Sequence, residues 1–174
     1  NFTEISNAWN LGYVAVCKES NSIKLISDSD NVVAQFEIDN QSPYLVINQA
    51  FRKNKFLISY SLGESQAMVL EIEFFNKRFN IKRKKNINNI LCVSGISMLN
   101  DDKFLLSDEL SGIVREHSFS KEKGRLVCTF GRNGKGLVRL PGRILVNKDN
   151  FFICDRHNYF IQEFNSKGSF VQQI

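Results

Sequence analysis

Basic side chains that can hold phosphate groups are concentrated in two stretches of this sequence. Lys82–Lys85 are four consecutive cations, and six basic but no acidic residues lie between Phe74 and Asn100. The second stretch, residues 132–159, mixes arginines with asparagine, histidine and tyrosine. Such cations attract polyanions, and the ring side chains can stack on unpaired bases. The candidate binding residues are Lys82, Arg83, Lys84, Lys85, Arg132, Asn133, Lys135, Arg139, Arg143, Arg156, His157 and Tyr159.

Patterns that would indicate catalysis or metal binding are missing from the sequence. Cys17, Cys92, Cys128 and Cys154 are widely spaced without a Cys-x-x-Cys pair, and there are two histidines. A zinc site needs several such ligands at short spacings, and no Gly-x-Ser-x-Gly nucleophile motif occurs. We therefore expect no catalytic residue, no metal and no cofactor. All of the cysteines except Cys92 lie in or beside apolar runs, which predicts buried thiols in a reducing compartment.

The charge is distributed unevenly along the chain. Its 174 residues carry 23 basic and 18 acidic side chains, a formal net charge of +5. Residues 1–50 hold two basic and six acidic side chains, net −4, so residues 51–174 hold 21 and 12, net +9. This asymmetry suggests a polyanion partner or a well-solvated surface. No run approaches 18 apolar residues, so we expect no membrane span.

A repeat supplies the elements that must position these side chains. The apolar run Phe151–Asp155 is followed by a polar turn and a second run, and the same order recurs 47 residues earlier at Phe104–Asp108. It recurs again at Phe56–Tyr60 and at Tyr13–Cys17, so the period is 43 to 48 residues. This period fits propeller blades of four antiparallel strands. We predict an all-β propeller of about four blades, at residues 1–40, 41–86, 87–131 and 140–174.

The last repeat shows its strands most clearly. Short apolar runs are separated by turns rich in Asn, Asp, Lys and Gly, as hairpins require. Residues 87–99 also fit a helical period, but Gly95, the β-branched residues and the repeat favour a strand there. The predicted strands of the last repeat are Arg143–Val146, Phe151–Cys154, Tyr159–Phe164 and Ser169–Ile174.

The fourth repeat resembles an NHL repeat. It contains Phe-Gly-x-x-Gly-x-Gly at residues 130–136, Leu140-Pro141, Asp-Arg-x-Asn at 155–158, Ile-Gln-x-Phe at 161–164 and Gly168-x-Phe170. The third repeat matches more loosely, with Asp108 in the place of Asp155, and the first two match mainly in spacing and apolar pattern. The resemblance implies a β-propeller, usually of six blades. Either the four blades of this chain close, or the ring is completed elsewhere.

Propeller topology places the loops between blades and the central hairpin of each blade on one face. We therefore expect the segment 131–141, the hairpin 155–158 and the segment containing Lys82–Lys85 to lie on a common face, so that the two basic stretches come together. A simpler interpretation of Lys82–Lys85 is a solvated strand end.

Simpler roles also exist for other residues of the motif. Asp155 and Asn158 can shape the hairpin through hydrogen bonds to the backbone, and the glycines can supply loop angles. Tyr159 can pack between blades, and His117, on a predicted strand, can be a buried core histidine.

Three kinds of function fit these expectations. The resemblance implies an RNA-binding propeller of a cytoplasmic, tripartite-motif-type post-transcriptional regulator, with single-stranded RNA as the partner. The alternative is a protein–protein interaction scaffold of a tripartite-motif-like ubiquitin ligase, although the sequence holds no RING-type cysteine–histidine array. The third is a metal-dependent propeller enzyme, and two histidines at non-equivalent positions argue against it.

Overall fold

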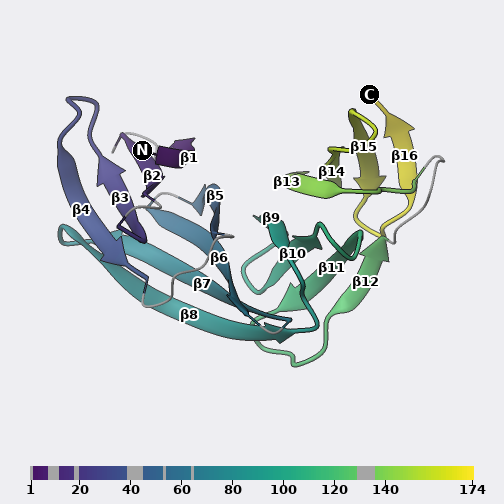
Figure 1. The fold of residues 1–174 in the computed structure, drawn as a ribbon, viewed down its shortest axis with the longest axis horizontal. Coiled ribbons are helices and arrows are strands. Elements are labelled where there is room, and N and C mark those ends of the chain that lie inside the picture. Colours follow the sequence, from purple (N-terminus) through teal and green to yellow (C-terminus); the bar gives the residue numbers. More distant parts are fainter. Residues whose placement is uncertain are drawn as a thin grey trace. The chain divides into compact units, whose positions relative to one another are not determined.

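The described part of the chain is built from β-strands alone. In the computed structural model, these residues form sixteen strands and no helix (Figure 1). A helix long and apolar enough to cross a membrane is not found among them. The structure describes residues 2–7, 12–17, 20–38, 45–52, 54–63, 65–128 and 136–174.

The strands form four antiparallel sheets, each made of four strands that follow one another along the chain. This is the blade arrangement that the repeat predicts, and we number the sheets as blades 1 to 4. Blade 1 contains β1 (Phe2–Asn7), β2 (Tyr13–Cys17), β3 (Ser22–Ile26) and β4 (Val32–Glu37); blade 2 contains β5 (Leu45–Arg52), β6 (Lys55–Gly63), β7 (Gln66–Phe75) and β8 (Arg78–Asn88); blade 3 contains β9 (Val93–Met98), β10 (Lys103–Asp108), β11 (Ile113–Ser118) and β12 (Arg125–Cys128); blade 4 contains β13 (Pro141–Asn147), β14 (Asn150–Asp155), β15 (Phe160–Asn165) and β16 (Phe170–Gln173).

Asparagines form several of the tight turns between these strands. Asn21 and Asn54 adopt φ angles of 45° and 62°, in the left-handed region that Asn tolerates better than most residues. Both side chains also donate a hydrogen bond to a backbone carbonyl, Asn21 to Ile38 at 2.6 Å and Asn54 to Phe74 at 2.8 Å. These two asparagines therefore tie the β2–β3 turn to the residue after β4 and the β5–β6 turn to β7.

The chain divides into two compact units, Asn1–Asn88 and Asn89–Ile174, with two blades in each. In the first unit, alternate residues of each strand point to one side of the sheet, so one face of blade 1 packs on one face of blade 2. This core contains Val14, Val16, Ile23 and Leu25 from blade 1 and Phe56, Ile58, Leu70 and Ile72 from blade 2.

The second unit repeats this construction with blades 3 and 4. Phe151 and Phe164 lie opposite each other on β14 and β15, and their rings stack with centroids 5.3 Å apart. The core contains Leu105 and Val114 from blade 3, Ile144, Phe151, Ile153 and Phe164 from blade 4, and Val138 from the segment between them.

Most of the strand predictions are confirmed. The four strands predicted in the last repeat correspond to β13–β16, and β9 (Val93–Met98) confirms a strand rather than a helix within residues 87–99.

One placement is wrong. Lys82–Lys85 lie inside β8, the outermost strand of blade 2, and not in a loop between blades. The edge of a sheet lacks a further strand, and charged side chains are common there because they discourage unwanted pairing.

Candidate binding surface on the loops of blades 3 and 4

The hairpin between β14 and β15 is organised by the buried carboxylate of Asp155. Its Oδ1 accepts hydrogen bonds from the backbone N–H groups of His157 and Asn158 at 3.1 and 3.2 Å, and its Oδ2 accepts one from the Asn158 side chain at 2.8 Å. The N–H of Arg139, in the segment that enters blade 4, also donates to Oδ2 at 3.0 Å. Asp155 thus joins two loops, which confirms a turn-shaping role for Asp155 and Asn158.

The same hydrogen bonds set the acidity of Asp155. Burial alone would raise its pKa, but the donors from Arg139, Asn158 and Leu140 stabilise the carboxylate and hold the pKa below its usual range. The side chain is therefore ionised whenever the surrounding hairpin is folded at neutral pH.

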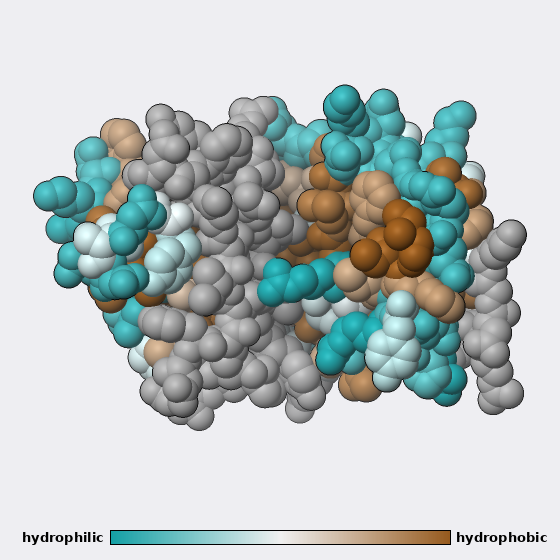
Figure 2. Space-filling model, turned by 90° about the horizontal axis from the view of Figure 1, so that it is seen from above, coloured by the Kyte–Doolittle hydropathy of each residue, from teal (hydrophilic) through white to brown (hydrophobic). Residues whose placement is uncertain are grey.

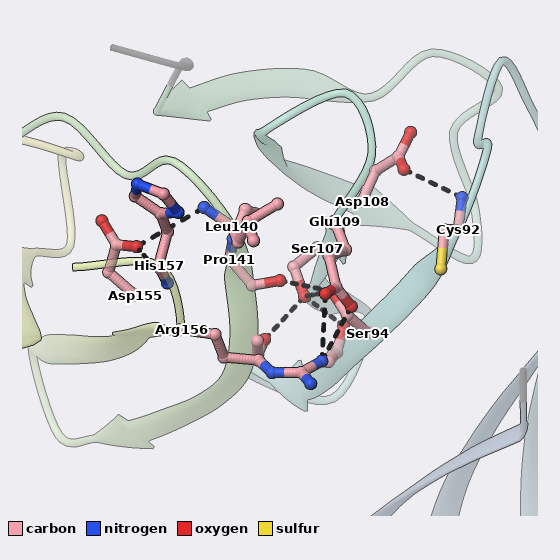
Figure 3. A network of polar contacts seen from close by, with 12 residues as sticks. Cys92, Ser94, Ser107, Asp108, Glu109, Leu140, Pro141, Asp155, Arg156 and His157 are labelled. Atoms are coloured by element: carbon pink, nitrogen blue, oxygen red, sulfur yellow. Dashed lines mark hydrogen bonds and ion pairs between the residues drawn. The ribbon is translucent and has the colours of Figure 1, made fainter. Parts of the chain in front are cut away.

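Blade 3 contains the equivalent arrangement around Asp108. Its two carboxylate oxygens accept hydrogen bonds from the N–H groups of Leu91 and Cys92, each at 2.9 Å. Figure 3 shows the bond from Cys92. Burial, with the negative charges of Glu109 and Asp108 nearby, raises the pKa of the Cys92 thiol to about 11, so this thiol stays protonated at neutral pH.

Arg139 and His157 lie in contact beside the Asp155 hairpin. Arg139 Nη1 is 2.6 Å from His157 Nε2. Because the guanidinium can only donate, Nε2 of His157 accepts in this arrangement and its ring proton is on Nδ1. The structure therefore brings together two of the predicted binding residues.

Arg156 joins the hairpins of blades 3 and 4. Its Nη1 lies 3.0 and 2.9 Å from the two carboxylate oxygens of Glu109 (Figure 3). The stem of Arg156 passes over Gly142, where a Cβ atom would lie 2.8 Å from the Arg156 Cδ. The sequence predicts a ligand contact for Arg156; in the structure its guanidinium pairs with Glu109 while its side chain remains 62% exposed.

Two serines, not singled out from the sequence, fix the start of blade 4 on blade 3. Ser107 Oγ is buried and donates to the carbonyl of Gly142 at 2.8 Å, and Ser94 Oγ contacts both Ser107 Oγ and the carbonyl of Pro141 (Figure 3). These contacts position β13, and with it the loops at its start. These contacts join residues 35 and 47 positions apart, so no local sequence pattern predicts them.

Tyr159 and Leu110 are the exposed apolar residues of the two hairpins. Tyr159 is 91% exposed and has a φ angle of 60°, which is unusual for a bulky residue. Leu110, in the equivalent hairpin of blade 3, is 67% exposed. The simpler interpretation, in which Tyr159 packs between blades, is wrong. Arg143, near the start of β13, is also exposed.

Lys82–Lys85 belong to the first unit, and two of them bind acidic residues of the neighbouring strand β7. Lys82 Nζ lies 2.7 Å from a carboxylate oxygen of Glu73. Arg83 forms an ion pair with Glu71, a carboxylate that is 1% exposed and is also contacted by Lys55 at 3.1 Å. Because an unpaired buried carboxylate is costly, Arg83 supports blade 2 itself. Lys84 is exposed to solvent.

Arg132, Asn133 and Lys135 lie outside the described residues. The described part of this segment begins at Gly136, whose N–H donates to Gln162 Oε1 at 3.0 Å. Gln162 Nε2 in turn donates to the carbonyl of Leu137 at 2.7 Å. Gln162 is 1% exposed. It is the glutamine of the Ile-Gln-x-Phe motif, and it anchors the loop that precedes blade 4.

His117 is a buried side chain, as expected. It is 5% exposed on β11 and stacks on Phe104, with ring centroids 5.6 Å apart. Within the described ranges, no group of three or more His, Cys, Asp and Glu side chains is arranged to hold a metal ion.

Four-stranded antiparallel sheets that follow one another along the chain are the blades of a β-propeller, and solved structures of similar fold support this class. A protein of unknown function from Bacteroides caccae matches over 100% of this chain and 60% of its own, with a TM-score of 0.69 and 10% identity. Streptogramin B lyase matches over 99% and 53%, with a TM-score of 0.67 and 10% identity. Kluyveromyces lactis Hsv2 with complete loop 6CD matches over 99% and 50%, with a TM-score of 0.56 and 14% identity.

The chain thus spans about half to three-fifths of the length of these structures. At these identities the similarity shows the fold alone. No protein-family model matches the sequence, and no curated protein matches it.

Proposed function

We propose that this chain is a non-catalytic binding module, an NHL-type propeller that binds single-stranded RNA through the loops of blades 3 and 4. The motifs at residues 130–170 support the NHL assignment, and the expected setting is a cytoplasmic post-transcriptional regulator. The binding surface consists of the hairpins 109–112 and 156–159, the segment 136–140 and Arg143.

The exposure of Tyr159 carries this proposal. An aromatic ring that is 91% exposed has no packing role inside the blade, and the hairpin holds it by the hydrogen bonds of Asp155. His157 lies two residues before Tyr159 in the same hairpin and contacts Arg139, and Arg143 lies on β13, the strand that pairs with β14. Stacking of one base on an aromatic side chain contributes about 1–3 kcal/mol, and nearby cations add salt-dependent attraction to the phosphates.

The pairing of Lys82, Arg83 and Arg156 with carboxylates refines the proposal. Cations that are already neutralised attract phosphates less, so we assign the centre of the surface to Tyr159 and His157.

Fluorescence anisotropy with a labelled oligouridylate of about 12 nucleotides tests this proposal. Tyr159→Ala is expected to weaken binding about 5- to 150-fold, the equivalent of 1–3 kcal/mol, and affinity should fall steeply with added salt. Phe75→Ala is the matched control, because Phe75 is 59% exposed on blade 2 and lies outside the surface. Unchanged affinity for Tyr159→Ala, or equal losses in both variants, would contradict the proposal.

A protein partner is the second candidate, and the exposure of Leu110 favours it. Leu110 and Tyr159 occupy equivalent hairpins, and exposed apolar residues of this kind anchor protein interfaces. The module would then be an interaction scaffold of a tripartite-motif-like protein. Leu110→Ser is expected to abolish capture of such a partner in a salt-insensitive pull-down while weakening RNA binding less than Tyr159→Ala does. A loss of RNA affinity as large as that of Tyr159→Ala would instead show that Leu110 serves RNA binding.

A further inference from the structure

The second unit contains a pocket at the strand ends opposite to the hairpins 109–112 and 156–159. The pocket has a volume of about 480 Å³, within the range of small-molecule sites. Its walls come from the start of β10, the end of β11, residues 121 and 123, and residues 166 and 167 of the turn between β15 and β16. It is therefore separate from the surface proposed to bind RNA.

The charges that line this pocket are mostly positive. Four lysines line it (Lys103, Lys121, Lys123 and Lys167), against one acidic residue, Glu116. Lys103 Nζ lies 2.9 Å from a Glu116 carboxylate oxygen, so these two charges offset each other. Four positive charges and one negative charge leave a net +3 on the lining. Cations that converge on one concavity concentrate the field there and favour a multiply charged anion.

A rigid base supports the pocket. His117 lines it, is 5% exposed and stacks on Phe104. Gly124 lies against the His117 ring, where a Cβ atom would approach two ring atoms to 2.6 Å. Glycine at position 124 therefore lets the segment that carries Lys121 and Lys123 lie close to this ring.

Side-chain hydrogen bonds hold the backbone of the lysines on both walls. Ser118 Oγ accepts the N–H of Lys121 at 3.1 Å, and Asp102 in turn accepts hydrogen bonds from Ser118 and Ser120. On the blade 4 side, Asn165 Oδ1 accepts the N–H of Lys167 at 3.0 Å. The turns thus fix where these lysine side chains begin, which lowers the entropic cost of gathering them around an anion.

From this arrangement we infer that the pocket binds a small molecule with two or more linked phosphate groups. Lysine ammonium groups are compact point charges that suit phosphate oxygens, and Ser166 adds a hydroxyl to the lining. Linked phosphates place several negative charges within one concavity of this size. Neighbouring phosphates of an RNA strand are spread along its backbone instead, so a compact polyanion fits better.

Isothermal titration calorimetry of the whole chain with diphosphate at low salt tests this inference. The double variant Lys123→Gln/Lys167→Gln is expected to weaken binding by about tenfold or more, because two converging charges are lost. Backbone NMR shifts on titration should concentrate at residues 103, 116–123 and 166–167. A parallel titration with ADP shows whether the ligand is a nucleotide, since tighter binding of ADP than of diphosphate at the same residues would add a base contact.

The matched control is Lys77→Gln/Lys148→Gln, which removes the same charge from two exposed turn lysines outside the pocket. The diphosphate affinity of this control variant should differ from that of the wild-type chain by less than twofold, that is, by less than about 0.4 kcal/mol. Absence of binding, equal losses in both double variants, or shifts spread over the whole surface would overturn the inference. Tyr159→Ala should leave diphosphate binding unchanged, so failure of the RNA proposal and failure of this one give different results.

Discussion

Blades 3 and 4 carry equivalent residues that end in opposite environments. Leu105 and Val114 of blade 3 are 1% and 0% exposed because they pack on blade 4. Forty-seven residues later, Phe152 is half-buried and Ile161 is 40% exposed. Leu145, which pairs with Phe152, is 61% exposed. Figure 2 shows hydrophobic side chains on the right-hand part of the surface, where Figure 1 places β13–β16.

The repeat therefore specifies an apolar face in each blade, whereas the presence of a neighbouring blade determines whether that face is buried. The free-energy cost of truncating a side chain on this face should therefore differ between the two blades. The same substitution is expected to be costly in blade 3 and nearly neutral in blade 4.

The largest effect is expected from leucine truncation on the two faces. Leu105→Ala removes a side chain from the closed interface and should lower the free energy of unfolding by about 2–5 kcal/mol, through lost burial and a residual cavity. Leu145→Ala should cost less than about 1 kcal/mol because the side chain is already exposed. Denaturant unfolding followed by circular dichroism measures both values. Similar losses for the two variants would mean that Leu145 is covered in solution.

The second effect concerns the buried aspartates at equivalent positions of the two blades, Asp108 in blade 3 and Asp155 in blade 4. Asp155→Asn removes the charge from a side chain that accepts several backbone hydrogen bonds, and a cost of about 1–3 kcal/mol is expected at neutral pH. Because the folded-state pKa is lowered, this contribution is fully present above the ordinary Asp pKa of about 4 and is lost as the pH falls through the lower folded value.

Unfolding measured at neutral pH and at about pH 3 should show the difference between wild type and Asp155→Asn shrinking in acid. Asp108→Asn gives the matching substitution in blade 3, measured at neutral pH alone. A difference between wild type and Asp155→Asn that stays constant with pH would contradict the role assigned to the Asp155 charge.

The smallest effect is expected from the ion pair that joins the two hairpins. Arg156→Gln should cost less than about 1 kcal/mol, because the Arg156 side chain is 62% exposed and water screens the pair. A double-mutant cycle with Glu109→Gln isolates the pair, and its coupling energy should decline with added salt. A coupling as large as the loss in Leu105→Ala would show that charge, rather than apolar packing, holds blades 3 and 4 together.

The strands of blade 4 were predictable because each is a short apolar run between residues that form turns. Asp155 was also predictable as a turn residue, since Asp commonly bonds the backbone two or three positions on. These signals are local, and the structure realises them with shifts of one or two residues at the strand ends.

The placement of Lys82–Lys85 could not be predicted in the same way. β8 is an 11-residue edge strand, and eight of its residues are polar or charged, so it lacks the alternation that marks a half-buried strand. Its countercharges, Glu71 and Glu73, lie on β7, about ten residues earlier. The pairing of Arg156 with Glu109 spans 47 residues. Contacts at such separations depend on blade stacking, which no local pattern specifies.

The order of strands within each sheet has a consequence for how the chain is made. Because each blade consists of four consecutive strands, all its backbone pairing is available once about 45 residues have left the ribosome. At about 5–20 residues per second, synthesis of one such segment takes roughly 2–9 s, far longer than the microseconds in which a hairpin forms. Each blade therefore has time to pair its strands before the next is synthesised, whereas its apolar face is buried only when the next blade docks on it.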